Sequence, residues 1–222
     1  MVTDVTSRGA IILASGMEEK TISRQFSPDE KGSLLEYVLD SVWTVADEIV
    51  VVFGKEPKLS TVESISPFGA KVITVNQNQG PMLSILEAFR TSKAEHCLLT
   101  TERVPLLKPN VILSLFENAL GHDLAIPRWN DGKLAPMLAV YRKNALLKLV
   151  STLSLSNGKD LKRDLGKIIE QLFAVRYVSV EKDLKEIDPE LDSFLEIDGD
   201  RSLSLAREKA SIKGKRLQKR AK

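Results

Sequence analysis

The chain has 222 residues, of which 43% are hydrophobic, and its formal net charge is +2 at pH 7. This length suits one domain with a sizeable core, and the near-neutral charge argues against bulk electrostatic attraction to nucleic acid or to a membrane surface. The one cysteine, Cys97, excludes an intramolecular disulfide. No stretch has the apolar length of a membrane span, and no signal peptide is recognisable. We therefore expect a cytoplasmic protein with no membrane partner.

Apolar runs that fit strands alternate along the chain with amphipathic stretches that fit helices. Pro81 suits the first turn of a helix, Asn110 is expected to cap another helix, and Gly121 is expected to end it. In chain order we predict a strand at 10–14, a helix at 33–46, strands at 48–53 and 71–75, a helix at 81–90, a strand at 96–100, a helix at 110–120, strands at 124–127 and 137–141, helices at 144–153 and 161–172, and a strand at 174–180.

This alternation predicts an α/β fold, a single Rossmann-like three-layer domain with helices on both faces of a mainly parallel, mixed sheet. Ligands of such sheets bind at the carboxyl ends of the strands, near the point where the strand order reverses. The loops that follow Leu13, Val75 and Thr100 are therefore the first places to search for a site.

Five segments of the chain lie in or next to loops of this predicted fold: 13-LASG-16, 80-GPM-82, 98-LLTTERVPLL-107, 125-AIPRWNDGKLAPMLAVYRKNALLKL-149 and 194-FLEIDGDRSL-203. In this order they resemble the molybdopterin-guanine dinucleotide biosynthesis protein A family, the molybdenum cofactor guanylyltransferases. The resemblance runs from about Ile11 to Leu203 and implies a fold of the nucleotide-diphospho-sugar transferase type. It implies an enzyme, a nucleotidyltransferase that transfers GMP from GTP to molybdopterin and releases pyrophosphate.

The resemblance implies that the nucleotide lies against the loop after the first strand. Backbone N–H groups of such a loop can hold phosphates, and the family adds basic side chains, to which Lys20 and Arg24 correspond as the catalytic residues. Ser15 replaces a glycine of the family's LAGG sequence, and the acids Glu18 and Glu19 lie within the loop. The implied nucleotide-binding residues are Leu13, Ala14, Ser15, Gly16, Asn76, Gly80, Pro81 and Arg103.

The resemblance also implies a Mg²⁺ ion that bridges the triphosphate oxygens. The family holds it with an Asp two residues before a Pro, a position that Arg103 occupies here. The preceding Glu102 is the expected metal ligand, and Asp198 is expected to be the second. Two structural alternatives stay open: Glu102 and Arg103 could form an exposed surface turn, and Asp198 or Asp200 could cap the helix that follows.

The fourth segment borders the pocket of the acceptor pterin in the family. The resemblance makes Arg128 and Lys133 possible contacts to the pterin phosphate, whereas Asp131-Gly132 is a strong turn sequence in its own right. Trp129 can equally be half-buried over a loop. For Tyr141 and Arg142 we prefer structural packing at a junction between a strand and a helix.

Residues 201–222 contain nine basic residues and one acidic residue. We expect a nucleotidyltransferase-like domain at 1–200, followed by a basic helical tail at 201–222. The tail can be a solvated helix or a patch for an anionic partner such as a protein. It lacks the interleaved aromatic residues that stack on RNA bases, so nucleic acid is not expected.

Two alternatives to the guanylyltransferase stay open at this point. The departures at Ser15 and Arg103 would also suit a nucleotide- or pterin-binding relative that has lost catalysis. An active nucleotidyltransferase could also use another phosphorylated acceptor.

Overall fold

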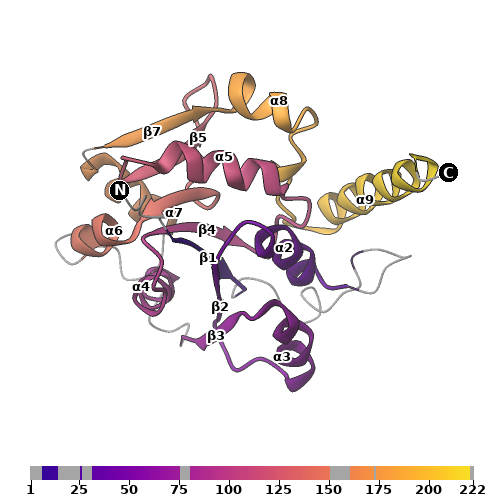
Figure 1. Ribbon diagram of the computed structural model, residues 1–222, viewed down its shortest axis with the longest axis horizontal. Coiled ribbons are helices and arrows are strands. Elements are labelled where there is room, and N and C mark those ends of the chain that lie inside the picture. The colour runs from indigo at the N-terminus through magenta and orange to yellow at the C-terminus, as the bar shows by residue number, and fades with distance from the viewer. Residues whose placement is uncertain are drawn as a thin grey trace, which may run out of the picture.

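The computed structural model describes residues 7–14, 26, 32–75, 81–150, 161–172 and 174–220. These residues form one seven-stranded sheet in the order β3-β2-β1-β4-β6-β5-β7 (Figure 1). The strands are β1 (Arg8–Leu13), β2 (Glu48–Phe53), β3 (Lys71–Thr74), β4 (His96–Thr101), β5 (Leu124–Arg128), β6 (Ala139–Arg142) and β7 (Val175–Ser179).

The sheet is mainly parallel and mixed, as predicted. Strands β1 to β4 pair in parallel, and β5 pairs in parallel with β7. Strand β6 is antiparallel to both of its neighbours, β4 and β5. The chain builds outward from β1 through β2 to β3 and then returns to place β4 on the other side of β1. The topological switch point, where ligands of such sheets bind, therefore lies between β1 and β4.

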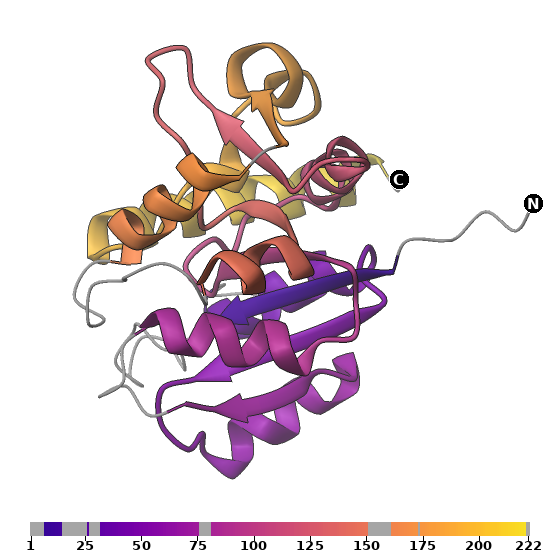
Figure 2. The same ribbon diagram turned by 90° about the vertical axis from the view of Figure 1, so that its left-hand side faces the viewer.

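Helices cover both faces of the sheet and complete the three layers (Figures 1 and 2). One face packs against α2 (Leu34–Trp43), α3 (Leu59–Ile65) and α5 (Pro109–Ala119). The other face packs against α4 (Pro81–Thr91), α6 (Lys143–Val150) and α7 (Leu161–Gln171). Alternate residues of β1 serve the two faces: Ile12 faces the first set of helices and Ile11 the second.

The remaining described elements are short, apart from the last helix. They are the 3₁₀ turn η1 (Ser66–Phe68), the π-helical turn η3 (Val180–Leu184), α8 (Lys185–Ile187), the 3₁₀ turn η4 (Asp192–Phe194) and α9 (Asp200–Arg220). Among the described residues, no helix has the length and apolar content needed to cross a membrane.

Each predicted strand and helix corresponds to an observed element, with bounds that differ by up to three residues among the described residues. Strand β2 matches residue for residue, because Gly54 ends its run of β-branched residues. The prediction that Asn110 caps α5 is wrong: Lys108 is the N-cap, and Pro109, whose ring fixes a helical φ, is the first helical residue. Gly121 follows α5 at φ 76°, in the left-handed region that glycine favours. Helix α3 was not predicted.

Contacts with the body hold the first half of helix α9. Leu203 and Ala206, in its first turns, are buried against Phe26, Leu34 and Leu106. The helix then runs outward from the body (Figure 1). The division of the chain at residue 200, and a protein partner for the basic tail, stay predictions.

Candidate functional site

The two central strands end side by side at one edge of the sheet. Leu13, the last residue of β1, pairs with Thr101, the last residue of β4. The next residue of each strand continues this alignment, because the Glu102 amide donates to the Leu13 carbonyl at 3.4 Å. The loops after β1 and β4 therefore start next to each other at the topological switch point, where the sequence predicted a ligand.

Only part of the predicted nucleotide-binding set can be placed. Leu13 and Ala14 are buried in the two core layers, so they offer backbone rather than side chains to a ligand. Pro81 is the first residue of α4. Six predicted residues lie outside the described part of the chain: Ser15, Gly16, Lys20, Arg24, Asn76 and Gly80.

Glu102 and Arg103 differ sharply in burial. The Glu102 side chain is turned inward, and the residue is only 1% exposed. Arg103 is partly exposed, and its amide donates to the Thr101 hydroxyl at 3.1 Å. The alternative of an exposed surface turn is therefore wrong for Glu102, which is buried within the turn that follows β4.

The third and fifth segments of the sequence meet at this edge. The Ile197 amide donates to the Arg103 carbonyl at 2.8 Å, and the Arg103 guanidinium lies 3.9 Å from the Glu196 carboxylate. The tripeptide Glu196-Ile197-Asp198 is thus held beside the loop that carries Glu102, although the two segments are far apart in the sequence.

Asp198 also takes part in the start of α9. Its carboxylate accepts a hydrogen bond from the Ser202 hydroxyl at 2.8 Å, and its amide donates to the same hydroxyl at 3.0 Å. The Gly199 amide donates to Ser202 as well, at 3.1 Å. These contacts tie Asp198 to the first turn of α9 through Ser202.

The donor set at this edge suits a divalent cation bound together with a polyphosphate. Glu102 and Asp198 are the sequence neighbours of Arg103 and Ile197, whose backbones are hydrogen-bonded to each other, and both offer hard carboxylate oxygens. Within the described ranges, no three or more His, Cys, Asp and Glu residues are grouped so that they could hold a metal alone. Mg²⁺ in enzymes of phosphate chemistry is commonly held by one or two carboxylates, with substrate phosphates and water completing its shell.

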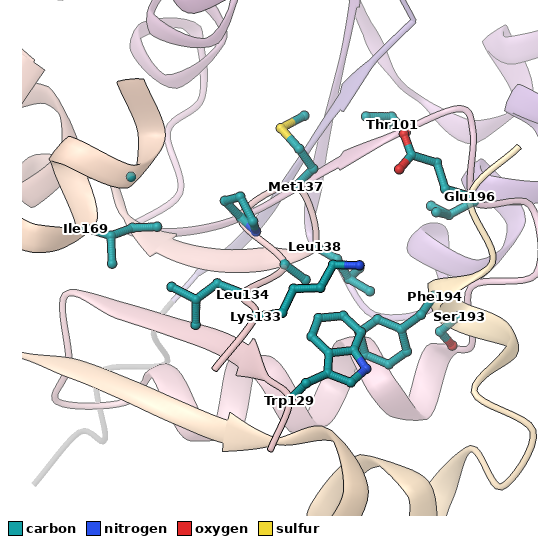
Figure 3. Close-up of a pocket in the computed structure, with 14 residues that line it drawn as sticks. Thr101, Trp129, Lys133, Leu134, Met137, Leu138, Ile169, Ser193, Phe194 and Glu196 are labelled. Carbon is teal, nitrogen blue, oxygen red and sulfur yellow. The ribbon is translucent and has the colours of Figure 1, made fainter. Parts of the chain in front are cut away.

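A pocket of about 540 Å³ opens beside this edge (Figure 3). Figure 3 shows Ile169 of α7 at one end of it and Thr101 and Glu196 at the other. Thr101 is the last residue of β4, so the pocket adjoins the carboxyl end of that strand. Its lining is mostly apolar: Val104, Trp129, Leu134, Ala135, Pro136, Met137, Leu138, Gly166, Ile169 and Phe194, with Thr101, Lys133, Ser193 and Glu196 as the polar members.

An aromatic pair and a lysine form one side of the pocket. The rings of Trp129 and Phe194 meet edge to face, with their centres 5.0 Å apart. The Lys133 ammonium lies 5.4 Å from the centre of the indole ring. Arg128, by contrast, is exposed and lies over the ring of Tyr177 at 5.0 Å. Of the two cations considered for the acceptor phosphate, only Lys133 lines the pocket.

The loop between β5 and β6 presents Trp129 and Lys133 through a tight turn. The Trp129 amide donates to the Lys133 carbonyl at 2.9 Å, and the Gly132 amide donates back to the Trp129 carbonyl at 2.9 Å. Gly132 has φ 88°, which a residue with a Cβ adopts only under strain. The Asp131 carboxylate accepts from the Lys133 amide at 2.9 Å. The turn predicted at Asp131-Gly132 is confirmed.

Tyr141 has a structural role, as the sequence analysis preferred. It is fully buried in β6, and its hydroxyl donates to the Pro136 carbonyl at 2.9 Å, behind the pocket lining. Burial raises the pKa of this phenol, so it stays protonated. Arg142 is likewise structural: its guanidinium lies 3.3 Å from the Glu95 carboxylate.

Several pocket residues were missed by the sequence analysis. Phe194 belongs to the fifth segment of the resemblance, but no local pattern gave it a role in a pocket. Ile169 and Gly166 carry no pattern that separates a pocket wall from an ordinary helix face.

The fold and the site together indicate the class of protein to which the chain belongs. A mainly parallel sheet with a buried carboxylate at its switch point and an adjoining pocket is typical of α/β proteins that bind nucleotides. The structure is similar to molybdopterin-guanine dinucleotide biosynthesis protein A from Archaeoglobus fulgidus, with a TM-score of 0.70 and 24% identity over 92% of this chain and 98% of that one. It is also similar to 2-C-methyl-D-erythritol 4-phosphate cytidylyltransferase from Thermus thermophilus, with a TM-score of 0.63 and 17% identity over 92% and 99%. At these identities the likeness establishes the fold, which is that of nucleotidyltransferases of the nucleotide-diphospho-sugar transferase type.

The sequence narrows this class to one family. The model of the MobA-like NTP transferase domain matches residues 10–174, and the chain belongs to that family of nucleotidyltransferases. A relative in Methanosarcina mazei, named a probable molybdenum cofactor guanylyltransferase, is 27% identical over 200 residues, which cover 86% of this chain and 85% of the relative. A relative of the same name in Methanosarcina acetivorans is 27% identical over 202 residues, which cover 86% of both chains.

Proposed function

We propose that this protein is a molybdenum cofactor guanylyltransferase, which transfers GMP from GTP to molybdopterin and forms molybdopterin guanine dinucleotide. The observation that carries the proposal is the pocket that adjoins the carboxyl end of β4, beside Glu102 and the loop after β1. An acceptor in that pocket would lie next to a nucleotide at the switch point. The names of the relatives support GTP and molybdopterin as the two substrates.

The reaction needs positioning and charge rather than a protein nucleophile. A phosphate oxygen of the acceptor attacks the α-phosphorus of GTP and forms the new P–O bond. The bond from that phosphorus to the bridging oxygen of the β-phosphate breaks, and pyrophosphate leaves with the electron pair. Holding the two substrates in line supplies much of the acceleration, and cations around the phosphates stabilise the charge that develops on them.

The residues take these roles in the proposal as follows. Lys20 and Arg24 hold the phosphates of GTP, with the backbone of the loop after β1 and with Arg103. Glu102 and Asp198 hold Mg²⁺, which when bound offsets the charge of the leaving pyrophosphate. Burial of Glu102 suits this role, because a carboxylate in the interior is stabilised by a bound cation far more than an exposed one.

The pocket supplies the acceptor site. Its apolar walls and the pair of Trp129 and Phe194 offer flat surface to the fused rings of a pterin. The Lys133 ammonium is available to the acceptor phosphate, because its contact with the Trp129 ring leaves its donors for a ligand.

Isothermal titration with GTP, ATP and CTP, each with and without Mg²⁺, tests the nucleotide half of the proposal. We expect GTP-selective binding that requires Mg²⁺ and that weakens roughly tenfold or more in Glu102→Gln, which removes the charge but keeps the shape. Glu186→Gln, a change of an exposed glutamate in α8, is the control and should bind as the parent does. A protein that binds no nucleotide under any of these conditions would refute the proposal.

A transfer assay then tests the chemistry. With GTP and molybdopterin, release of pyrophosphate should match formation of the dinucleotide, and Glu102→Gln should lower kcat by about 100-fold or more. GTP binding without transfer to molybdopterin would instead favour a relative that has lost catalysis or that uses another acceptor.

A further inference from the structure

The pocket wall that carries Phe194 and Glu196 has an unusual backbone. It follows a turn in which Leu191 has φ 50°, the only positive φ of a non-glycine residue in the described part of the chain. A leucine in this left-handed conformation is strained and persists only where the surroundings hold it. The Leu191 amide donates to the Asp188 carbonyl at 2.8 Å, and the Phe194 amide donates to the Leu191 carbonyl at 3.0 Å.

A cluster of buried charges holds this turn. The Asp188 carboxylate accepts hydrogen bonds from two amides of the turn, that of Asp192 at 3.2 Å and that of Ser193 at 2.8 Å. Lys108, the N-cap of α5, forms an ion pair with Asp188 and lies 3.7 Å from the Asp192 carboxylate. The Lys108 amide also donates to the Ser193 hydroxyl at 3.1 Å. The turn is thus fixed to α5 from one side.

Lys209 of α9 holds the turn from the other side. Its ammonium lies 2.6 Å from the Asp192 carboxylate and 3.9 Å from the Glu190 carboxylate. The Asp192 side chain is only 3% exposed, so water and salt screen this pair much less than a surface pair. Two residues after Asp192, Phe194 meets Trp129 in the pocket.

We propose that Lys209 is a positioning residue of the acceptor pocket. By pairing with Asp192 it holds the strained turn at Leu191, and through that turn it fixes Phe194 against Trp129. Helix α9 then acts as a clamp that sets the shape of the pocket and its affinity for the acceptor. The effect on acceptor affinity rests on the proposed function, but the effect on the wall does not.

Loss of the lysine would act through Asp192. The nearer of the two cations at Asp192 is then lost, and the Lys108 ammonium remains at 3.7 Å, so the charge of this buried carboxylate is less well compensated and the carboxylate gains by moving toward water. Movement of Asp192 carries Ser193 and Phe194 with it, because all three belong to the same turn, η4. The sheet and Glu102 are not part of this turn, and the hydrogen bond from the Ile197 amide to the Arg103 carbonyl separately holds the segment that carries Asp198. The nucleotide side of the site should therefore be affected much less than the wall.

The fluorescence of Trp129 reports the wall without any substrate. The chain contains two tryptophans, and Trp43 is 56% exposed at the end of α2, so Trp43→Phe leaves Trp129 as the single reporter. In this background, Lys209→Gln should raise the acrylamide quenching constant of Trp129 by about twofold or more. Lys209→Arg should restore it, and Arg201→Gln, an exposed change in the same helix, should leave it unchanged.

Kinetics of the full-length enzyme give the second readout. Lys209→Gln should raise the KM for the acceptor roughly fivefold to tenfold, with kcat and the KM for GTP changed less than about twofold. A role confined to stability would not separate the two KM values. If Lys209→Gln no longer unfolds cooperatively, Lys209→Met, which keeps the apolar stem, replaces it in both measurements.

The outcomes separate the two proposals. Unchanged quenching of Trp129 in a folded Lys209 variant overturns the positioning role, whatever the activity. Changed quenching in a protein that never transfers GMP supports the positioning role and refutes the proposed function. Changed quenching in an active enzyme with an unaltered acceptor KM overturns the link between the wall and acceptor affinity.

Discussion

At the scale of single residues, two cations that are close in sequence have different surroundings. Lys133 lines the pocket over Trp129, whereas Arg128 lies on the exposed ring of Tyr177. The sequence presented them as equivalent candidates for a phosphate contact. Because of these different surroundings, a substitution of Lys133 tests the phosphate contact and the same substitution of Arg128 is its matched control.

Lys133→Gln should raise the KM for molybdopterin about tenfold and leave the KM for GTP unchanged, since one charge-assisted hydrogen bond to a phosphate contributes about 1.5–3 kcal/mol. Steady-state kinetics with each substrate varied in turn measure both values. Arg128→Gln removes the same charge outside the pocket and should have no effect on either KM. An equal rise of the KM for molybdopterin in both variants would show that the overall positive charge near the pocket, and not a contact of Lys133, governs acceptor binding.

The proposed metal site shows which single residues could be predicted from the sequence and which could not. Resemblance singled out Glu102 and Asp198, but it left open whether Glu102 is exposed. Strand alternation could not settle the point, because Glu102 lies in the turn after the last residue of β4, Thr101. The buried cluster of Lys108, Asp188, Asp192 and Lys209 could not be predicted, since its members are up to 101 residues apart in the sequence.

At the scale of secondary structure, the strands were easier to predict than the ends of the helices. β-branched runs bounded by glycine or charged residues locate strands well, as β2 shows. The N-cap of α5 was misplaced by two residues, because Pro109 at the first helical position decides where the helix starts and Asn110 does not. The antiparallel direction of β6 carries no local sequence pattern, because it depends on which strands lie beside it.

The β5–β6 loop is the element whose shape matters most for the acceptor. Gly132→Ala forces a Cβ onto a residue with φ 88° and should cost about 1 kcal/mol of stability. Because the turn presents Trp129 and Lys133, we also expect the KM for the acceptor to rise several-fold. Denaturant unfolding and acceptor kinetics measure the two effects.

Gly69→Ala provides the control for this variant. Gly69 has φ 63° and follows η1, and a Cβ at either glycine meets no atom within 4 Å. The loss of stability should therefore be similar, without any change in acceptor kinetics. A rise in acceptor KM in Gly69→Ala as well would mean that stability alone, and not the shape of the turn, governs binding.

At the scale of the whole molecule, the edge of the sheet opposite the site contains a charge that couples folding to pH. Glu48, the first residue of β2, pairs with Lys71 of β3 and accepts hydrogen bonds from the Ser92 hydroxyl at 2.8 Å and the Lys93 amide at 2.7 Å. Burial by itself would raise the pKa of Glu48. The hydrogen bonds from Lys71, Ser92 and Lys93 outweigh it and lower the pKa from 4.5 to about 2.

The lowered pKa fixes the sign of the pH dependence. Between the two values the unfolded chain binds a proton that the folded protein does not, so the free energy of unfolding falls as the pH drops from 4.5 toward 2. The expected loss is on the order of 2–3 kcal/mol. Urea unfolding across this range measures it. Glu48→Gln should flatten the dependence of the free energy of unfolding on pH. Glu63→Gln, a change of an exposed residue in α3, should show the same dependence as the parent protein.

The fold class was predictable at this scale and the site as a whole was not. Alternating strands and helices specify a mainly parallel sheet with two covered faces, and the order of the motifs identifies the family. The pocket, however, joins Thr101, Trp129, Ile169 and Phe194. Only the order of the strands across the sheet brings these residues together, and helical or strand periodicity contains no information about that order.

The hydrogen bond between Ile197 and Arg103 joins two segments that are synthesised far apart in time. Strands β1 to β4 are complete once residue 101 has been synthesised, so the centre of the sheet can pair early. The wall with Phe194, and the helix with Lys209, emerge almost a hundred residues later. A nascent chain can therefore form the centre of its sheet, with Glu102, before Phe194 and Asp198 have been synthesised. A chain that ends before the wall lacks one side of the pocket and the second of the two proposed metal ligands.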